Sequence, residues 1–116
     1  MTHGDTIAAI ATAPGEGGVS IIRVSGPASF RIADAVFAGA PPPPSQREAF
    51  TMVPGRVLDA DGAVLDEVLL LVFRAPRSYT REDVVEIQGH GGPVVARRLL
   101  RRVHDAVRSR RTCTHP

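Results

Sequence analysis

Residues 80–93 have the sequence TREDVVEIQGHGGP, and this stretch decides the fold. The apolar, β-branched run at 84–87 is typical of a strand, and the glycines that precede Pro93 are typical of a turn that leads into a helix. Strand residues alternate between two faces, so we expect Val85 and Ile87 on one face and Glu86 on the other. A strand, a glycine-rich turn and a helix therefore follow one another here.

The flanking sequence predicts further strands and one more helix. Strands are expected at residues 6–12, 19–25, 50–58, 63–74 and 83–88. Helices are expected between Pro27 and Gly39 and from about Pro93 onward, because apolar residues recur there at helical spacing. This order predicts an α+β fold in which a mixed β-sheet of about five strands is covered mainly on one face by two to three helices.

Three loops are recognisable from their turn residues. Residues 14–18, PGEGG, join the first two strands, and a hairpin turn is favoured over a phosphate-binding loop because a strand follows instead of a helix. Residues 59–62, DADG, predict a second hairpin turn in which Gly62 supplies a positive φ. Pro41 to Pro44 predict an exposed loop, because consecutive prolines fit neither a sheet ladder nor a helix interior.

The composition is that of a single soluble domain of 116 residues. Its longest apolar run, 68–73, is too short to cross a bilayer, and residues 1–10 lack the features of a signal peptide. A lone cysteine, Cys113, rules out an internal disulfide framework. We therefore expect a cytoplasmic protein with no membrane contact.

All 14 basic residues are arginine. The absence of lysine excludes a P-loop and Schiff-base chemistry within this chain. Residues 97–111 hold seven arginines against one acid, whereas residues 1–96 hold seven against 11. This arginine cluster suits either RNA phosphates or the exposed face of a helix whose Leu99, Leu100 and Val103 pack inward. The second interpretation is favoured, because no aromatic residues interleave to stack on bases.

Two charged residues lie inside predicted strands. Glu86 is an ordinary surface acid if its face of the sheet is solvated, but it needs a partner if that face lines a pocket. A carboxylate that accepts two parallel donors suits an amino-heterocycle such as a pterin. Arg23, between Ile22 and Val24, can face water, pair with an acid or bind a ligand anion. The pattern alone leaves these alternatives open.

The turn Gly89-His90-Gly91-Gly92 is a further candidate ligand contact. It lies between a strand and a helix N-terminus, where backbone N–H groups can meet an anion or a polar ring; alternatively its glycines only relieve a steric clash. His90 is a possible acid or base, but the sequence shows no Ser, Cys or Asp partner for it. We therefore predict no catalytic residue. The histidines and Cys113 lack metal-ligand spacing, so we also predict no metal site.

Three stretches together resemble the N-terminal domain of the tRNA modification GTPases called MnmE or TrmE. They are DTIAAIAT followed by PGEGGV at 5–12 and 14–19, IRVSG at 22–26, and YTREDVVEIQGHGGP at 79–93. The resemblance runs from about Asp5 to Val103. It implies that residues 1–103 are a folate-binding and dimerisation domain, similar in fold to the tetrahydrofolate-binding domains of aminomethyltransferases.

The resemblance also implies ligands and partners. The family binds 5-formyltetrahydrofolate or another one-carbon tetrahydrofolate, and its folate-contacting Arg and Glu correspond to Arg23 and Glu86. The full-length family also uses GTP, Mg²⁺ and K⁺ in a separate G domain. It acts as a homodimer with MnmG (GidA) on tRNA, where it builds a carboxymethylaminomethyl-type group on the wobble uridine.

The chain departs from the family in several ways. It has no G domain, no counterpart of the family's downstream folate-contacting Lys, and an atypical tail at 104–116, which suggests a truncated or frameshifted product. Two alternatives to the folate-binding module therefore stay open. One is a non-catalytic dimerisation fragment with an incomplete folate pocket, and the other is an Arg-rich RNA-binding module.

Overall fold

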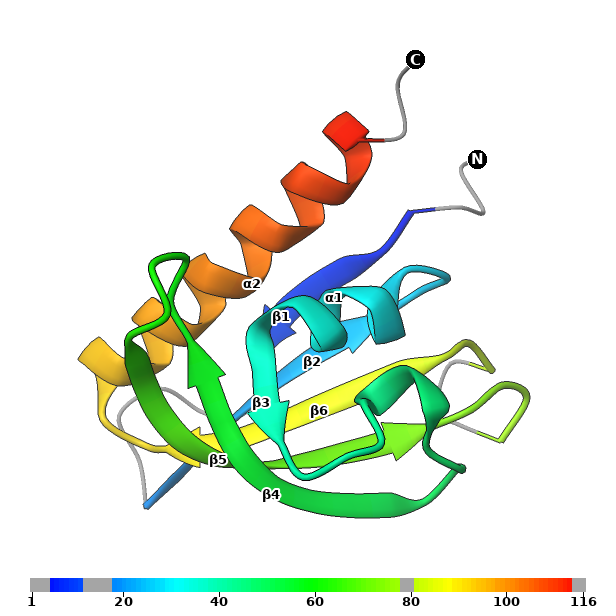
Figure 1. Ribbon diagram of the computed structural model, residues 1–116, viewed down its shortest axis with the longest axis horizontal. Coiled ribbons are helices and arrows are strands. Elements are labelled where there is room, and N and C mark those ends of the chain that lie inside the picture. The colour runs from blue at the N-terminus through cyan, green and yellow to red at the C-terminus, as the bar shows by residue number, and fades with distance from the viewer. Residues whose placement is uncertain (1–4, 12–17, 78–80, 114–116) are drawn as a thin grey trace.

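The computed structural model describes residues 5–11, 18–77 and 81–113, with side chains described as far as residue 108. The strands are β1 (Ile7–Ile10), β2 (Val19–Ser25), β3 (Phe37–Gly39), β4 (Thr51–Leu58), β5 (Val64–Phe73) and β6 (Val84–His90). The helices are α1 (Ser29–Val36), α2 (Pro93–Cys113) and the short 3-10 helix η1 (Pro44–Gln46). Figure 1 shows how these elements are arranged.

The strands form one six-stranded sheet in the order β1-β2-β6-β5-β4-β3. The α+β class is confirmed, with one strand more than expected. Every pairing in this sheet is antiparallel, whereas the sequence suggests a mixed sheet. The reason is that β6, far from β2 in sequence, inserts between β2 and β5 and runs opposite to both. The added strand is the short β3, whose Phe37 is buried and pairs with Val57.

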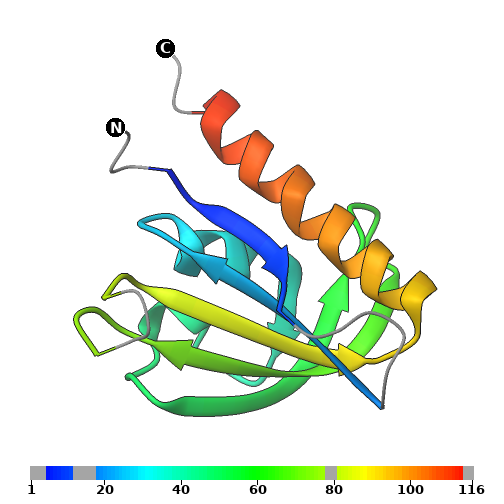
Figure 2. The same cartoon turned by 180° about the vertical axis from the view of Figure 1, so that it is seen from behind.

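Both helices lie on one side of the sheet, which curls around them (Figures 1 and 2). Alternate strand residues on this helical face form the core with the apolar faces of α1 and α2, because both element types bury one side. The fully buried side chains include Ile22, Val24, Ile32, Leu70, Val72, Val85, Ile87, Leu99 and Val103. The other side of the sheet, which we call the open face, carries no helix.

Helix α2 is tied to its neighbours by Arg102, which the sequence suggests is simply exposed. Its Nε donates to the Leu58 carbonyl at 2.7 Å, and its Nη2 donates to the Ala35 carbonyl at 3.2 Å. One arginine thus links α2 to the end of β4 and to α1. Arg97, Arg98 and Arg101 are exposed, as expected, while Leu99 and Val103 pack inward.

The predicted hairpins β1–β2 and β4–β5 are both present. Gly62 has a φ of 92°, as the turn requires, whereas the loop at 14–17 lies outside the described residues. The proline-rich segment is exposed at Pro41 to Pro43, but Pro44 is buried and begins η1.

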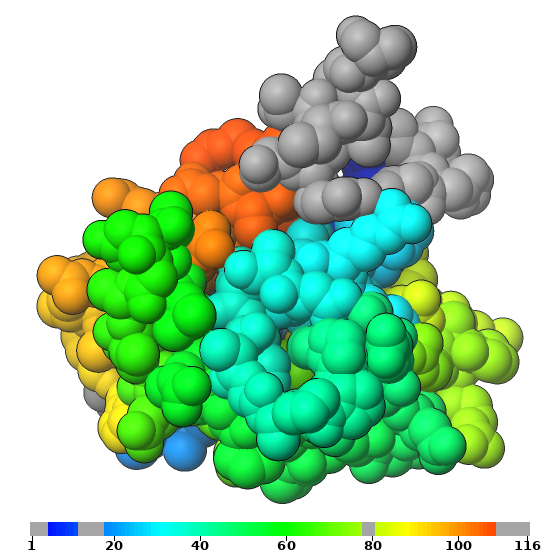
Figure 3. All heavy atoms as spheres, viewed as in Figure 1, coloured from blue at the N-terminus to red at the C-terminus, as the bar shows by residue number. Residues whose placement is uncertain are grey.

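In the space-filling view, helix α1, the proline-rich segment and the β4–β5 turn lie at the front (Figure 3). These segments lie on the helical side of the sheet. No helix in the described part of the chain is long and apolar enough to span a membrane.

Candidate ligand-binding site

Arg23 and Glu86 lie directly opposite each other on the neighbouring strands β2 and β6. Arg23 donates from Nε at 2.9 Å and from Nη2 at 2.8 Å, and both bonds end on the same oxygen, Glu86 Oε2. Since paired residues of an antiparallel ladder share a face and Val85 and Ile87 are in the core, both charged side chains belong to the open face. The two candidate residues are therefore brought together.

Glu86 is 5% exposed, although it lies on the side of the sheet that carries no helix. A buried carboxylate is costly unless it is paired, and the Arg23 side chain, 37% exposed, supplies the pairing charge. A carboxylate offers about four acceptor positions, and Arg23 uses only those of Oε2. No residue of the described part donates to Oε1, so this buried oxygen keeps its acceptor positions.

The glycine-rich turn after β6 has two distinct parts. Gly89 is packed tightly: a Cβ there would lie 2.6 Å from Asp66 Oδ2 and 2.9 Å from Leu99 Cδ1. Gly92, by contrast, would place a Cβ in open space, and its carbonyl accepts the first helical bond of α2, from Ala96 N–H at 3.0 Å. Gly91 is half-buried between them.

His90 has an acidic partner, contrary to the sequence-based expectation. Its Nδ1 lies 2.5 Å from Asp66 Oδ1, and its backbone N–H donates to Asp66 Oδ2 at 2.8 Å. Asp66 could not be recognised as the partner from the sequence, because it lies 24 positions away on β5. The available signal is an acidic residue at an inward-facing position of a strand whose other inward-facing residues, Val68, Leu70 and Val72, are apolar.

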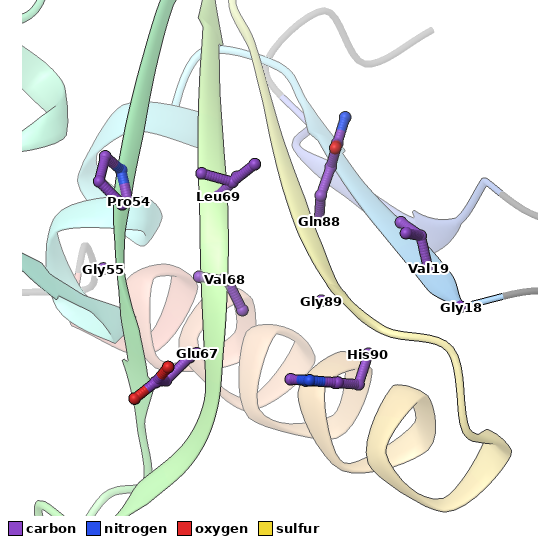
Figure 4. A pocket seen from close by; sticks show the side chains of 10 residues that line it. All are labelled: Gly18, Val19, Pro54, Gly55, Glu67, Val68, Leu69, Gln88, Gly89 and His90. Carbon is purple, nitrogen blue, oxygen red and sulfur yellow. The ribbon is translucent and has the colours of Figure 1, made fainter.

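The open face is hollowed at the end of the sheet where β6 leads into α2. The hollow has a volume of about 360 Å³. Its lining residues are Gly18, Val19, Pro54, Gly55, Glu67, Val68, Leu69, Gln88, Gly89 and His90. Figure 4 shows these residues on four strands with helix α2 behind them. The described residues contain no group of three or more His, Cys, Asp or Glu that suits a metal ion.

Residues 6–113 match the family model described as "GTP-binding protein TrmE N-terminus". The chain belongs to the TrmE N-terminal domain family. It is 49% identical over 100 residues to a tRNA modification GTPase MnmE of Roseiflexus sp. (strain RS-1). It is 58% identical over 99 residues to the MnmE of Alkalilimnicola ehrlichii, and 52% identical over 96 residues to that of Listeria innocua.

These alignments cover 86%, 85% and 83% of the chain, respectively, but only 21% of each relative. The chain thus corresponds to the N-terminal domain of MnmE proteins and spans about a fifth of their length. The TrmE family model extends to residue 113, and helix α2 also continues to Cys113. The division at Val103 between a family domain and an atypical tail stays a prediction.

Proposed function

We propose that this TrmE N-terminal domain binds a one-carbon tetrahydrofolate through Arg23 and Glu86. The observation that carries the proposal is the buried Glu86 carboxylate, whose Oε2 takes both bonds from Arg23 while Oε1 accepts none from the described residues. A pterin ring presents adjacent N–H donors along one edge, which is the pattern that a fixed carboxylate recognises.

Arg23 has two roles in this proposal. It holds the Glu86 carboxylate in one orientation, so that binding need not order that side chain. With its side chain 37% exposed, it also places positive charge at the rim of the site, where it meets a carbonyl or carboxylate group of the ligand. When bound, the folate supplies the one-carbon group, and the residues of this chain bind and orient it.

The open face also supports a proposed homodimer. Four exposed apolar side chains lie on it: Ile7, Val19, Met52 and Leu69. The strand registers place all four on the same side of the sheet as Arg23 and Glu86. Burying this apolar surface between two copies of the chain provides a driving force for association.

The wider role follows from the relatives named tRNA modification GTPase MnmE. We propose that the domain serves a full-length MnmE protein that modifies the wobble uridine of tRNA together with MnmG in the cytoplasm. GTP, Mg²⁺ and K⁺ belong to the G domain of that protein. The one-carbon unit that this domain binds is the donor for a carboxymethylaminomethyl-type group.

Isothermal titration with 5-formyltetrahydrofolate tests the binding site. We expect Glu86→Ala and Arg23→Ala each to weaken binding at least about tenfold, since each removes a charge-assisted contact. Glu48→Ala and Arg31→Ala are matched controls, because both side chains are exposed and have no described ion pair. Wild-type affinity in both site variants would remove the assignment. A folded chain that dimerises without binding folate would instead support the dimerisation-fragment alternative.

A further inference from the structure

The ladder between β5 and β6 ends before β6 does. The last paired residues are Leu69 and Gln88, whereas β6 stays paired with β2 as far as His90. Beyond Gln88, the Asp66 side chain takes over the role of a strand carbonyl and accepts the His90 backbone N–H. The hollow of the open face lies where the backbone hydrogen bonds between β5 and β6 end and the Asp66 side chain replaces them.

The Asp66 carboxylate accepts three bonds there. Oδ1 accepts the Glu67 backbone N–H at 2.9 Å and lies 2.5 Å from His90 Nδ1, and Oδ2 accepts the His90 backbone N–H at 2.8 Å. A carboxylate is an acceptor only, so Nδ1 must carry the proton of the His90 ring. In the neutral ring, Nε2 is then left with its lone pair available. Asp66 thus fixes both the tautomer and the orientation of the imidazole.

Gly89 makes this arrangement possible. A Cβ at this position would approach within 2.6 Å of Asp66 Oδ2, so any side chain would push the carboxylate away from His90. Gly89 therefore leaves room for the Asp66 carboxylate beside His90, in addition to its place in the turn.

The His90 side chain is 70% exposed, and the Asp66 side chain behind it is 8% exposed. His90 lines the hollow, and Figure 4 shows its ring extending from β6 toward β5. His90 and Gln88 share the open face with Glu86, because they are alternate residues of one strand. Along the strand, Glu86 and Gln88 are about 7 Å apart, and so are Gln88 and His90.

The charges around the hollow indicate what it accepts. Strand β5 contributes one acid to the lining, Glu67, which lies opposite Arg56 on β4, and the buried Asp66 lies behind His90. Val19 of strand β2 and the preceding Gly18 carry no charge, and the first turn of α2, residues 93–96, has no titratable side chain. A neutral N–H or O–H donor with an apolar flank suits these walls better than an anion does.

We propose that His90, positioned by Asp66, is a second contact for the folate that Glu86 binds, and that its Nε2 accepts a hydrogen bond from an N–H or O–H of that ligand. The inference rests on the proposed function and extends it along β6. Asp66 acts through His90 and is a positioning residue. The apolar part of the ligand lies against Leu69 and Val19.

The test is titration of 5-formyltetrahydrofolate into the wild type, His90→Gln and Asp66→Asn, with Glu86→Ala as the reference for a lost site. His90→Gln should bind about tenfold more weakly, because the hydrogen bond to Nε2 is lost. Asp66→Asn should weaken binding to a similar extent, although His90 remains present.

Nitrogen NMR of the His90 ring gives a readout independent of affinity. The neutral ring should carry its proton on Nδ1, and Asp66→Asn should move it to Nε2, because the Asn amide can donate to Nδ1. Wild-type affinity in His90→Gln, with binding lost in Glu86→Ala, would overturn this inference and leave the proposed function standing. A proton on Nε2 in the wild type would overturn it too. If the folded wild type does not bind 5-formyltetrahydrofolate, both the proposed function and the inference about His90 are wrong.

Discussion

Arg23 Nε and Nη2 converge on one oxygen of Glu86, at 2.9 and 2.8 Å, across the paired strands β2 and β6. Arg23 thus supplies the opposite charge for the Glu86 carboxylate, which is 5% exposed, through Oε2 alone. The second oxygen, Oε1, keeps its acceptor positions. In the proposed function, the pair therefore links stability to ligand binding, and removing either partner is expected to alter both.

The first prediction concerns the stability of this pair. Arg23→Ala leaves the Glu86 carboxylate buried without its partner, so we expect the free energy of unfolding to fall by about 1–3 kcal/mol. The lower part of that range is expected because Arg23 is partly exposed. Adding Glu86→Gln to Arg23→Ala should recover part of the loss, and urea denaturation of the four proteins measures the coupling. Strict additivity would show that the two residues do not interact.

Gly89 and Gly92 belong to the same turn but should differ in how well they tolerate a side chain. Gly89→Ala forces a Cβ toward Asp66 and Leu99, so we expect a loss of about 1–3 kcal/mol in the free energy of unfolding. Gly92→Ala places its Cβ in open space and should stay within about 0.5 kcal/mol of the wild type. Equal effects of the two substitutions in thermal denaturation would contradict the packing described for Gly89.

Helix α2 should contribute to stability mainly through its buried face. Leu99 is fully buried, so Leu99→Ala should lower the free energy of unfolding by about 2–5 kcal/mol through lost burial and a cavity. Val94→Ala, on an exposed turn of the same helix, should cost about 0.5 kcal/mol or less. Chemical denaturation of both variants provides the check. A small effect at Leu99 would mean that α2 does not pack on the sheet as described.

The proposed homodimer predicts a mutational asymmetry between the two sides of the sheet. Met52→Glu places a charge among the exposed apolar residues of the open face, so it should shift sedimentation toward the monomer. Ala35→Glu, on the exposed surface of α1, is the control and should leave the oligomeric state unchanged. A shift with Ala35→Glu alone would place the interface on the helical side.

Much of the fold could be predicted from local patterns. Alternation within residues 84–88 places Val85 and Ile87 in the core and Glu86 on the other face, as the structure confirms. The aspartate-rich turn that ends at Gly62 has the expected positive φ. These features depend on neighbouring residues only, so a single sequence contains them.

Pairing between distant segments could not be predicted in the same way. The position of β6 between β2 and β5 depends on contacts across more than 60 residues, such as Arg23 with Glu86. The sequence therefore identifies both residues as candidates without showing that they touch. Asp66 was missed for the same reason, because its role exists only once β5 and β6 lie side by side.

The most direct test of folate binding at Arg23 and Glu86 is NMR mapping of the chain with 5-formyltetrahydrofolate. We predict that the largest amide shift changes fall on β2 and β6, at residues 19–25 and 84–90, and that they disappear in Glu86→Gln, which keeps the side-chain shape but removes the charge. Changes confined to α1 and α2, or an unaltered response in Glu86→Gln, would contradict the proposal.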